Sequence, residues 1–301
     1  MTVEEHTRAQ TTGALAATGS FLLWGLFPIY WKQLEGVPAI ELIAHRITWS
    51  LFFLLGVLAW QRRFGDLRPA FGSAQRIGLN LLSSLLLSAN WTVYVWAVNA
   101  GHVIETSLGY FLVPLVNVAL GFLLLHEKLR RLQWTAIALA GVGVGVLLLR
   151  VGHVPWIALA LAGTWSGYGL LKKQSALGPI AGLTVETLLL VPLAVALLLW
   201  WHHTGTGALG RVDGRMHAFI LGAGVVTAVP LLLFAHGAQR IRLTTLGLLQ
   251  YLAPTVQFLI GLFMYREPFD SARLQAFALI WVGLILYSGD GLWAQRHRLK
   301  S

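Results

Sequence analysis

Apolar runs recur along the whole chain, and this feature restricts the fold more than any other. Each run is about 20 residues long, which is enough for an α-helix to cross the hydrocarbon core of a bilayer. Only 11% of the residues are charged, whereas an ordinary soluble domain is about one quarter charged. A transmembrane β-barrel would instead show alternating segments of about ten residues. The sequence therefore predicts an all-α polytopic membrane protein.

We expect ten transmembrane helices joined by short connections. The predicted ranges are 13–32, 40–60, 76–97, 104–125, 132–150, 154–172, 180–201, 216–238, 243–265 and 272–293. Most of the 22 Lys and Arg residues fall in loops on the side of the N-terminus, so the positive-inside rule places both termini in the cytoplasm. The same clusters explain the net charge of +10, and nucleic acid is not expected as a partner.

The chain also contains an internal repeat. Residues 107–129 resemble residues 245–269, and Pro114, Gly121 and Glu127 recur there as Pro254, Gly261 and Glu267. Earlier in the chain, Trp24, Lys32 and Pro38 match Trp165, Lys173 and Pro179 at a constant offset. A unit of five helices is odd, so the second copy must enter the membrane from the opposite side. We therefore predict a 5+5 inverted repeat of residues 1–150 and 151–301, an architecture of alternating-access transporters.

Four stretches carry a resemblance to a known family. They are WGLFPIYWK (24–32), ELIAHRITWS (41–50), NWTVYVWAVNAGHVIETSLGYFLVPLVNVALG (90–121) and EKLRRLQW (127–134). These motifs resemble the RarD branch of the EamA family, within the drug/metabolite transporter superfamily. The resemblance implies a carrier in the bacterial inner membrane that moves small metabolites, amino acids or drugs, often outward. Proteins of this branch carry the label "chloramphenicol-sensitive".

Three ionisable residues lie near the start of the second predicted helix. Glu41 and His45 are about 40° apart on one helical face, whereas Arg46 points about 140° away from Glu41. Charge inside hydrocarbon is costly, so these groups need a cavity, a partner or the interface. One interpretation is a cluster that reaches to the outer membrane interface. The other is that Glu41 and His45 line the outer mouth of a pathway, in which case Glu41→Gln abolishes transport while the protein stays folded.

Polar and aromatic residues inside other predicted helices give further candidates for contact with a substrate. Asn90 and Tyr94 share a face of helix 76–97, with Trp91 adjacent, and could either bind a small organic solute or pack between helices. Trp24 and Tyr110, which lie in the motifs that carry the resemblance, complete this aromatic set.

Pro114 and Pro254 are expected to interrupt two matching helices, since proline removes a helical hydrogen bond. Paired broken helices point to a transporter site, although a purely structural kink is an equal alternative. Asn117 and Gln257 follow the two prolines at the same spacing, and could satisfy freed backbone groups or face a cavity.

Glu186 is the acidic residue of the second half that lies well within a predicted span. It is interpreted either as the partner of a His or Arg on a neighbouring helix or as a coupling carboxylate. Lys172 and Lys173 are interpreted as charges at the cytoplasmic end of a helix.

The function that these features favour is secondary transport of a small organic metabolite or drug, with proton coupling through Glu41, His45 or Glu186 as a further hypothesis. The expected partners are the solute and membrane lipid, and no cofactor or metal is expected. Two alternatives are an intramembrane enzyme acting on a lipid-like substrate and a non-transporting receptor or scaffold.

Overall fold

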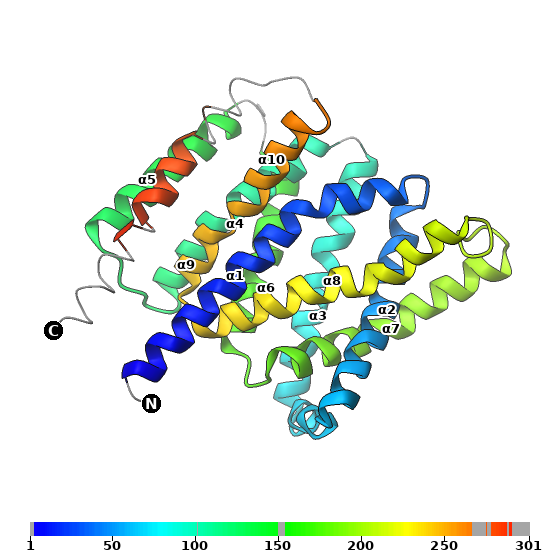
Figure 1. Cartoon of the computed structure of the whole chain (residues 1–301). Coiled ribbons are helices and arrows are strands. Elements are labelled where there is room, and N and C mark those ends of the chain that lie inside the picture. Colours follow the sequence, from blue (N-terminus) through cyan, green and yellow to red (C-terminus); the bar gives the residue numbers. More distant parts are fainter. Residues whose placement is uncertain are drawn as a thin grey trace.

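The computed structural model describes residues 3–100, 102–149, 154–266, 275, 278–287 and 289–290, and this part of the chain folds into helices and short connections (Figure 1). The α-helices are α1 (Val3–Trp31), α2 (Ala39–Gln61), α3 (Ala74–Asn99), α4 (Val103–Leu123), α5 (Arg131–Leu148), α6 (Trp156–Gln174), α7 (Pro179–His203), α8 (Gly214–Arg240), α9 (Leu243–Leu249) and α10 (Leu252–Phe263). A further apolar helix spans Ala278–Tyr287. Two 3-10 helices, η1 (Lys32–Leu34) and η2 (Phe64–Phe71), lie in connections.

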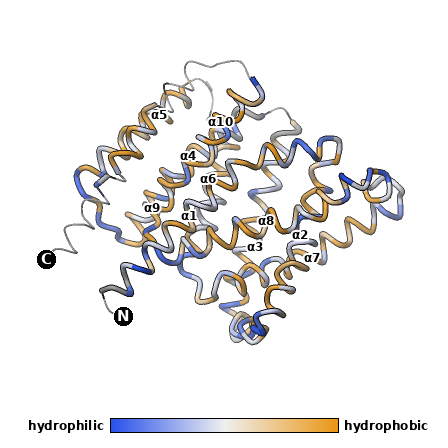
Figure 2. Tube along the Cα trace, viewed as in Figure 1, coloured by the Kyte–Doolittle hydropathy of each residue, from blue (hydrophilic) through white to orange (hydrophobic). Residues whose placement is uncertain are grey.

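Among the described residues, six helical stretches are long and apolar enough to cross a membrane: Thr7–Leu34, Ala39–Gln61, Glu105–Leu123, Pro179–His203, Gly214–Arg240 and Leu243–Phe263. Large apolar side chains also face outward, such as Leu149 and Leu193, which a lipid environment accommodates without cost. Figure 2 shows hydrophobic residues along the helices and hydrophilic residues concentrated in several connections. The chain is therefore a helical, multi-pass integral membrane protein.

The helices begin and end within a few residues of most predicted ranges, with two differences. α1 begins at Val3, well before residue 13, because the polar segment before its apolar run continues the same helix. At about 1.5 Å per residue, the 29 residues of α1 are longer than a hydrocarbon core about 30 Å thick. The last predicted range, 272–293, lies partly outside the described residues.

The second difference concerns the two prolines expected to break matching helices. The predicted helix 243–265 is split into α9 and α10 by a turn at Gln250 and Tyr251. Pro254 accounts for the split, because its ring would clash with the carbonyl of Gln250 in a continuous helix. By contrast, α4 is one helix that contains Pro114, so the interruption expected there is wrong.

The main helix contacts join residues 1–150 to residues 151–301, and they come in matching pairs. α2 packs against α7, and α4 packs against α9. α1 packs against α8 and α10, whereas α6 packs against α3 and α4 (Figure 1). Trp24 and Trp165, which the repeat aligns, meet with ring centroids 5.3 Å apart. Each contact therefore has a counterpart in which the helices of the two halves are exchanged.

Two of the residues that recur in the repeat, Gly121 and Glu127, have a structural explanation in the first copy. The Glu127 carboxylate accepts hydrogen bonds from the backbone N–H groups of Leu243, at 2.7 Å, and Thr244, at 3.0 Å. It therefore satisfies donors at the start of α9 in the opposite half. Gly121 makes room for this contact, because a Cβ there would lie 2.8 Å from Glu127 Oε2. Glu267, the matching residue, lies outside the described residues.

Candidate functional site

A buried ion pair between Lys172 and Glu186 joins α6 to α7. Lys172 Nζ lies 2.7 Å from Glu186 Oε1, and the two side chains are 4% and 2% exposed. Ser83 of α3 donates a hydrogen bond to Glu186 Oε1, and the Tyr168 hydroxyl donates one to Oε2 at 3.3 Å. The hydrogen bonds from Ser83 and Tyr168 are important for stability. The attraction between two buried charges offsets the cost of removing them from water only when further hydrogen bonds satisfy both groups.

This pair borders a cavity of about 260 Å³. The cavity is formed by η2, the first half of α3, the end of α6, the connection that follows α6, and Glu186 of α7. Its polar lining includes Arg76, Asn80 and Ser83 as well as the ion pair. The volume is close to the lower end of the range for small-molecule sites, which begins at about 300 Å³.

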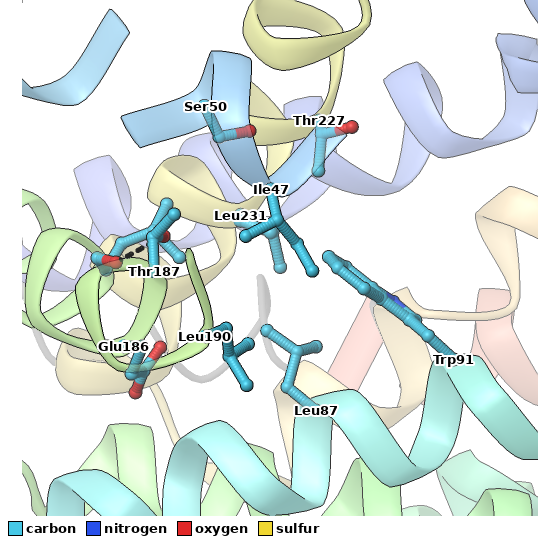
Figure 3. Close-up of a pocket in the computed structure, with 10 residues that line it drawn as sticks. Ile47, Ser50, Leu87, Trp91, Glu186, Thr187, Leu190, Thr227 and Leu231 are labelled. Carbon is cyan, nitrogen blue, oxygen red and sulfur yellow. Dashed lines mark hydrogen bonds between the residues drawn. The ribbon is translucent and has the colours of Figure 1, made fainter. Parts of the chain in front are cut away.

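A second space lies between four helices that come in equal number from the two halves. It is lined by residues of α2, α3, α7 and α8: Ile47, Ser50, Leu87, Trp91, Leu183, Glu186, Thr187, Leu190, Thr227 and Leu231 (Figure 3). We call it the central space. Its volume of about 20 Å³ is enough for roughly one water molecule. Glu186 lines both the central space and the larger cavity, so it stands at the boundary between them.

Lys172 lies with Lys173 in the last turn of α6, so the prediction of two charges at a helix end is confirmed. The Lys172 side chain is buried and paired within the protein, and it lies over the Tyr168 ring one helical turn earlier. Lys173 donates a hydrogen bond to the backbone carbonyl of Ile241, where α8 ends. A signal for Lys172 was present in the sequence, because a carboxylate deep in an apolar span needs a cation and α6 ends only a short connection before α7.

Glu41 and His45 lie together, as their helical spacing predicts, but both are buried. Glu41 Oε1 lies 3.7 Å from His45 Nε2 and accepts a hydrogen bond from the backbone N–H of Ala208 at 2.6 Å. Ala208 belongs to the connection between α7 and α8, so this hydrogen bond holds the connection against the start of α2. Neither side chain lines the larger cavity or the central space. The geometry thus favours a structural role for the pair.

This geometry changes the expected result of replacing Glu41. Glu41→Gln should retain folding and transport, because the amide oxygen can still accept the Ala208 hydrogen bond. Glu41→Ala should lower the free energy of unfolding by about 1–3 kcal/mol, since it leaves a buried N–H without an acceptor. Thermal unfolding of the purified variants and transport per folded molecule would measure both effects. A Glu41→Gln protein that folds normally and does not transport would contradict this role.

The predicted amide candidates make hydrogen bonds between helices. Asn90 is fully buried and donates to the Leu161 carbonyl and to Thr164 Oγ1, both at 3.0 Å, which joins α3 to α6. Asn117 is 1% exposed and donates to Gln250 Oε1 at 3.5 Å. Gln257 is exposed and donates to the Trp24 carbonyl at 3.1 Å. Asn90 and Asn117 therefore serve packing, whereas Gln257 keeps an exposed side chain between α10 and α1.

The predicted aromatic candidates fall into two groups. Trp24 packs against Trp165 and Phe234, and Phe234 stacks on Tyr168, so this group reaches the tyrosine that binds Glu186. The second group consists of Trp91, Tyr94 and Tyr110, with Tyr94 and Tyr110 at a ring-centroid distance of 5.8 Å. Sequence reasoning missed the cation at this second group, Arg46, which lies 4.6 Å from the centre of the Trp91 ring. Within the described residues, no group of three or more His, Asp or Glu side chains could hold a metal ion.

Comparison with known proteins gives the family of this chain. The model of the EamA-like transporter family matches residues 11–149. The uncharacterized transporter YojE of Bacillus subtilis (strain 168) is 45% identical over 280 residues, which cover 92% of this chain and 93% of the relative. Protein RarD of Escherichia coli (strain K12) is 38% identical over 288 residues, with 96% and 97% covered.

A solved crystal structure of a protein 21% identical to this chain shares its fold, with a TM-score of 0.72. The match covers 97% of this chain and 100% of that protein. The names of the relatives indicate transport rather than catalysis. At these identities and coverages, the chain belongs to the EamA-like transporter family and is a relative of the RarD proteins.

Proposed function

We propose that this protein is a secondary transporter that exports a small organic metabolite or drug by alternating access. The observation that carries the proposal is the place of the Lys172–Glu186 pair between the larger cavity and the central space. A buried, fully bonded charge pair at such a boundary can hold one state closed and rearrange in another. Transporters also place substrate sites near the midplane, between their two halves.

The proposal includes the topology expected from the repeat: ten spans, two inverted halves of residues 1–150 and 151–301, and both termini in the cytoplasm of a bacterium. The exchange of helix contacts between the halves supports it, as does the meeting of Trp24 with Trp165. In this topology η2 and the end of α6 lie on the cytoplasmic side, so the larger cavity opens toward the cytoplasm.

Proton coupling, as part of this proposal, belongs to Glu186 rather than to Glu41 or His45. Glu186 borders two spaces and has a cation, a serine and a tyrosine as partners. A proton on Glu186 would neutralise the carboxylate and release Lys172, which changes the charge that faces the cavity. Glu41 and His45 are closed off from both spaces.

A screen in proteoliposomes tests the function directly. The purified protein is reconstituted, and uptake of a panel of small metabolites and drugs is measured with and without a pH gradient. The proposal expects saturable movement of at least one solute above protein-free vesicles, and stimulation by the gradient. Covalent change in a lipid, with no movement of any solute by folded protein, would instead support the intramembrane enzyme.

A further inference from the structure

Arg46 carries a cation into the membrane-spanning part of α2 without a carboxylate partner. Its Nε donates to Thr227 Oγ1 of α8 at 2.8 Å. In the part of the chain that the structure describes, the ion pairs within 4.0 Å join other residues, and the N–H groups of Arg46 Nη1 and Nη2 donate no hydrogen bond. The side chain is only partly buried. Since charges inside membrane proteins pair or face a cavity, this arginine has capacity for a further ligand.

Aromatic rings hold the Arg46 guanidinium in place. Its central carbon lies 4.8 Å from the ring centre of Trp31 and 4.6 Å from that of Trp91, within the range of cation–π attraction. An arginine that lies over a ring uses the face of its planar group. Its outer N–H groups point along the plane, and stay available for an acceptor that binds with two oxygens.

Two tyrosines follow on from the Trp91 ring. Tyr94 lies one helical turn after Trp91 on α3, its ring centroid is 5.8 Å from that of Tyr110, and neither hydroxyl makes a hydrogen bond to the other described residues. Tyr94 is 39% exposed. We call Arg46, Trp31, Trp91, Tyr94, Tyr110 and Thr227 the Arg46 cluster. It offers a guanidinium, hydroxyls and aromatic surface, and contains no acidic side chain.

The Arg46 cluster lies beside the central space between the two halves. Trp91 and Thr227, which contact Arg46, also line the central space, and Figure 3 shows them there together with Glu186 of α7. A solute held by Arg46 would therefore lie close to the space that the Lys172–Glu186 pair borders.

We propose that Arg46 binds the carboxylate of a small organic acid whose uncharged, apolar body lies against the surrounding aromatic rings. A carboxylate matches the paired N–H groups of arginine. This inference names the substrate class, and as a transport substrate that class rests on the proposed function.

Binding to the detergent-purified protein tests the inference with matched probes. The probes are cyclohexanecarboxylate and phenylacetate, each compared with its neutral amide, and the readout is the shift in unfolding temperature with probe concentration. We expect the carboxylates to stabilise the protein saturably and the amides to have little effect. Arg46→Gln should weaken carboxylate binding by about tenfold to a hundredfold, the range for hydrogen bonds to charged groups.

Two further variants separate binding from folding. Arg46→Lys keeps the charge and the attraction to the rings but loses the two-pronged geometry, so the protein should fold and bind the carboxylates more weakly. Arg215→Gln is the control, because Arg215 also lies over a ring, that of Phe219, and donates to Gln33, but is exposed. It should bind like the unmodified protein.

The inference is overturned by any of these binding results: no stabilisation by either carboxylate, equal stabilisation by acid and amide, or unchanged binding in both Arg46 variants. Transport of neutral solutes that is indifferent to Arg46→Gln would also overturn it, and would leave the proposed transport function intact. Conversely, Arg46-dependent carboxylate binding by a protein that moves no solute would contradict the transport function alone.

Discussion

Lys172→Met should abolish transport and sharply reduce the amount of folded protein. The variant leaves the Glu186 carboxylate buried beside Ser83 and Tyr168 with no cation. Breaking a buried pair from one side costs about 3–5 kcal/mol, which is a large part of a typical stability. The measurements are the yield of monodisperse protein after purification and solute uptake per folded molecule in proteoliposomes.

The double variant Lys172→Met/Glu186→Leu distinguishes a structural pair from a functional one. Replacing both charges with apolar groups is often neutral for stability, so folding should return close to normal. Transport should not return, because the charges at the boundary of the cavity are gone. Lys128→Met, at an exposed lysine, is the control and should change neither property. A double variant that transports at the normal rate would show that the pair serves only stability.

Gly224→Val should prevent most of the protein molecules from folding. At Gly224, α8 comes so close to α2 that a Cβ would lie 2.4 Å from the Trp49 carbonyl carbon and 2.6 Å from the Ser50 backbone nitrogen. Backbone atoms cannot move aside as a flexible side chain can, so the helices must separate. The separation would also break the hydrogen bond from Ser50 Oγ to the Gly224 carbonyl, which measures 2.9 Å.

The cost of the smaller change, Gly224→Ala, should be at least about 1–3 kcal/mol, as for other overpacked interiors. Gly56→Ala is the matched control, because Gly56 lies on α2 and a Cβ there meets nothing within 4 Å. That variant should be neutral or slightly more stable, since alanine favours helix by about 1 kcal/mol over glycine. Thermal unfolding of the two alanine variants would measure the difference. Equal melting temperatures would contradict the close contact of α2 and α8.

The helices could be predicted from the sequence because apolar runs and the polar residues between them reflect the bilayer directly. The break near Pro254 followed from proline chemistry, whereas the same argument was wrong for Pro114, which α4 contains without interruption. Proline removes one hydrogen bond and adds one clash, but the surroundings of the helix decide whether a break follows.

Site residues were harder to predict, because helical spacing places side chains on a face and does not say what that face meets. The spacing of Glu41 and His45 correctly placed them together, yet burial against the α7–α8 connection could not be read from it. Lys172 was correctly placed at a helix end, but its pairing with Glu186 depends on the packing of α3 against both α6 and α7, which helical spacing does not show. Arg46 was correctly directed away from Glu41, but the rings that receive it come from α1 and α3.

The account depends on two halves that cross the membrane in opposite directions, and single-cysteine labelling tests this most directly. The natural chain has no cysteine, so one introduced thiol is the sole site of reaction. Glu35 and Ala176 occupy corresponding positions in the two copies, and both are exposed. A membrane-impermeant maleimide should label Glu35→Cys in intact cells, and should label Ala176→Cys only after the membrane is opened. Labelling of both cysteines from the same side would contradict the inverted arrangement, and with it the proposed mechanism.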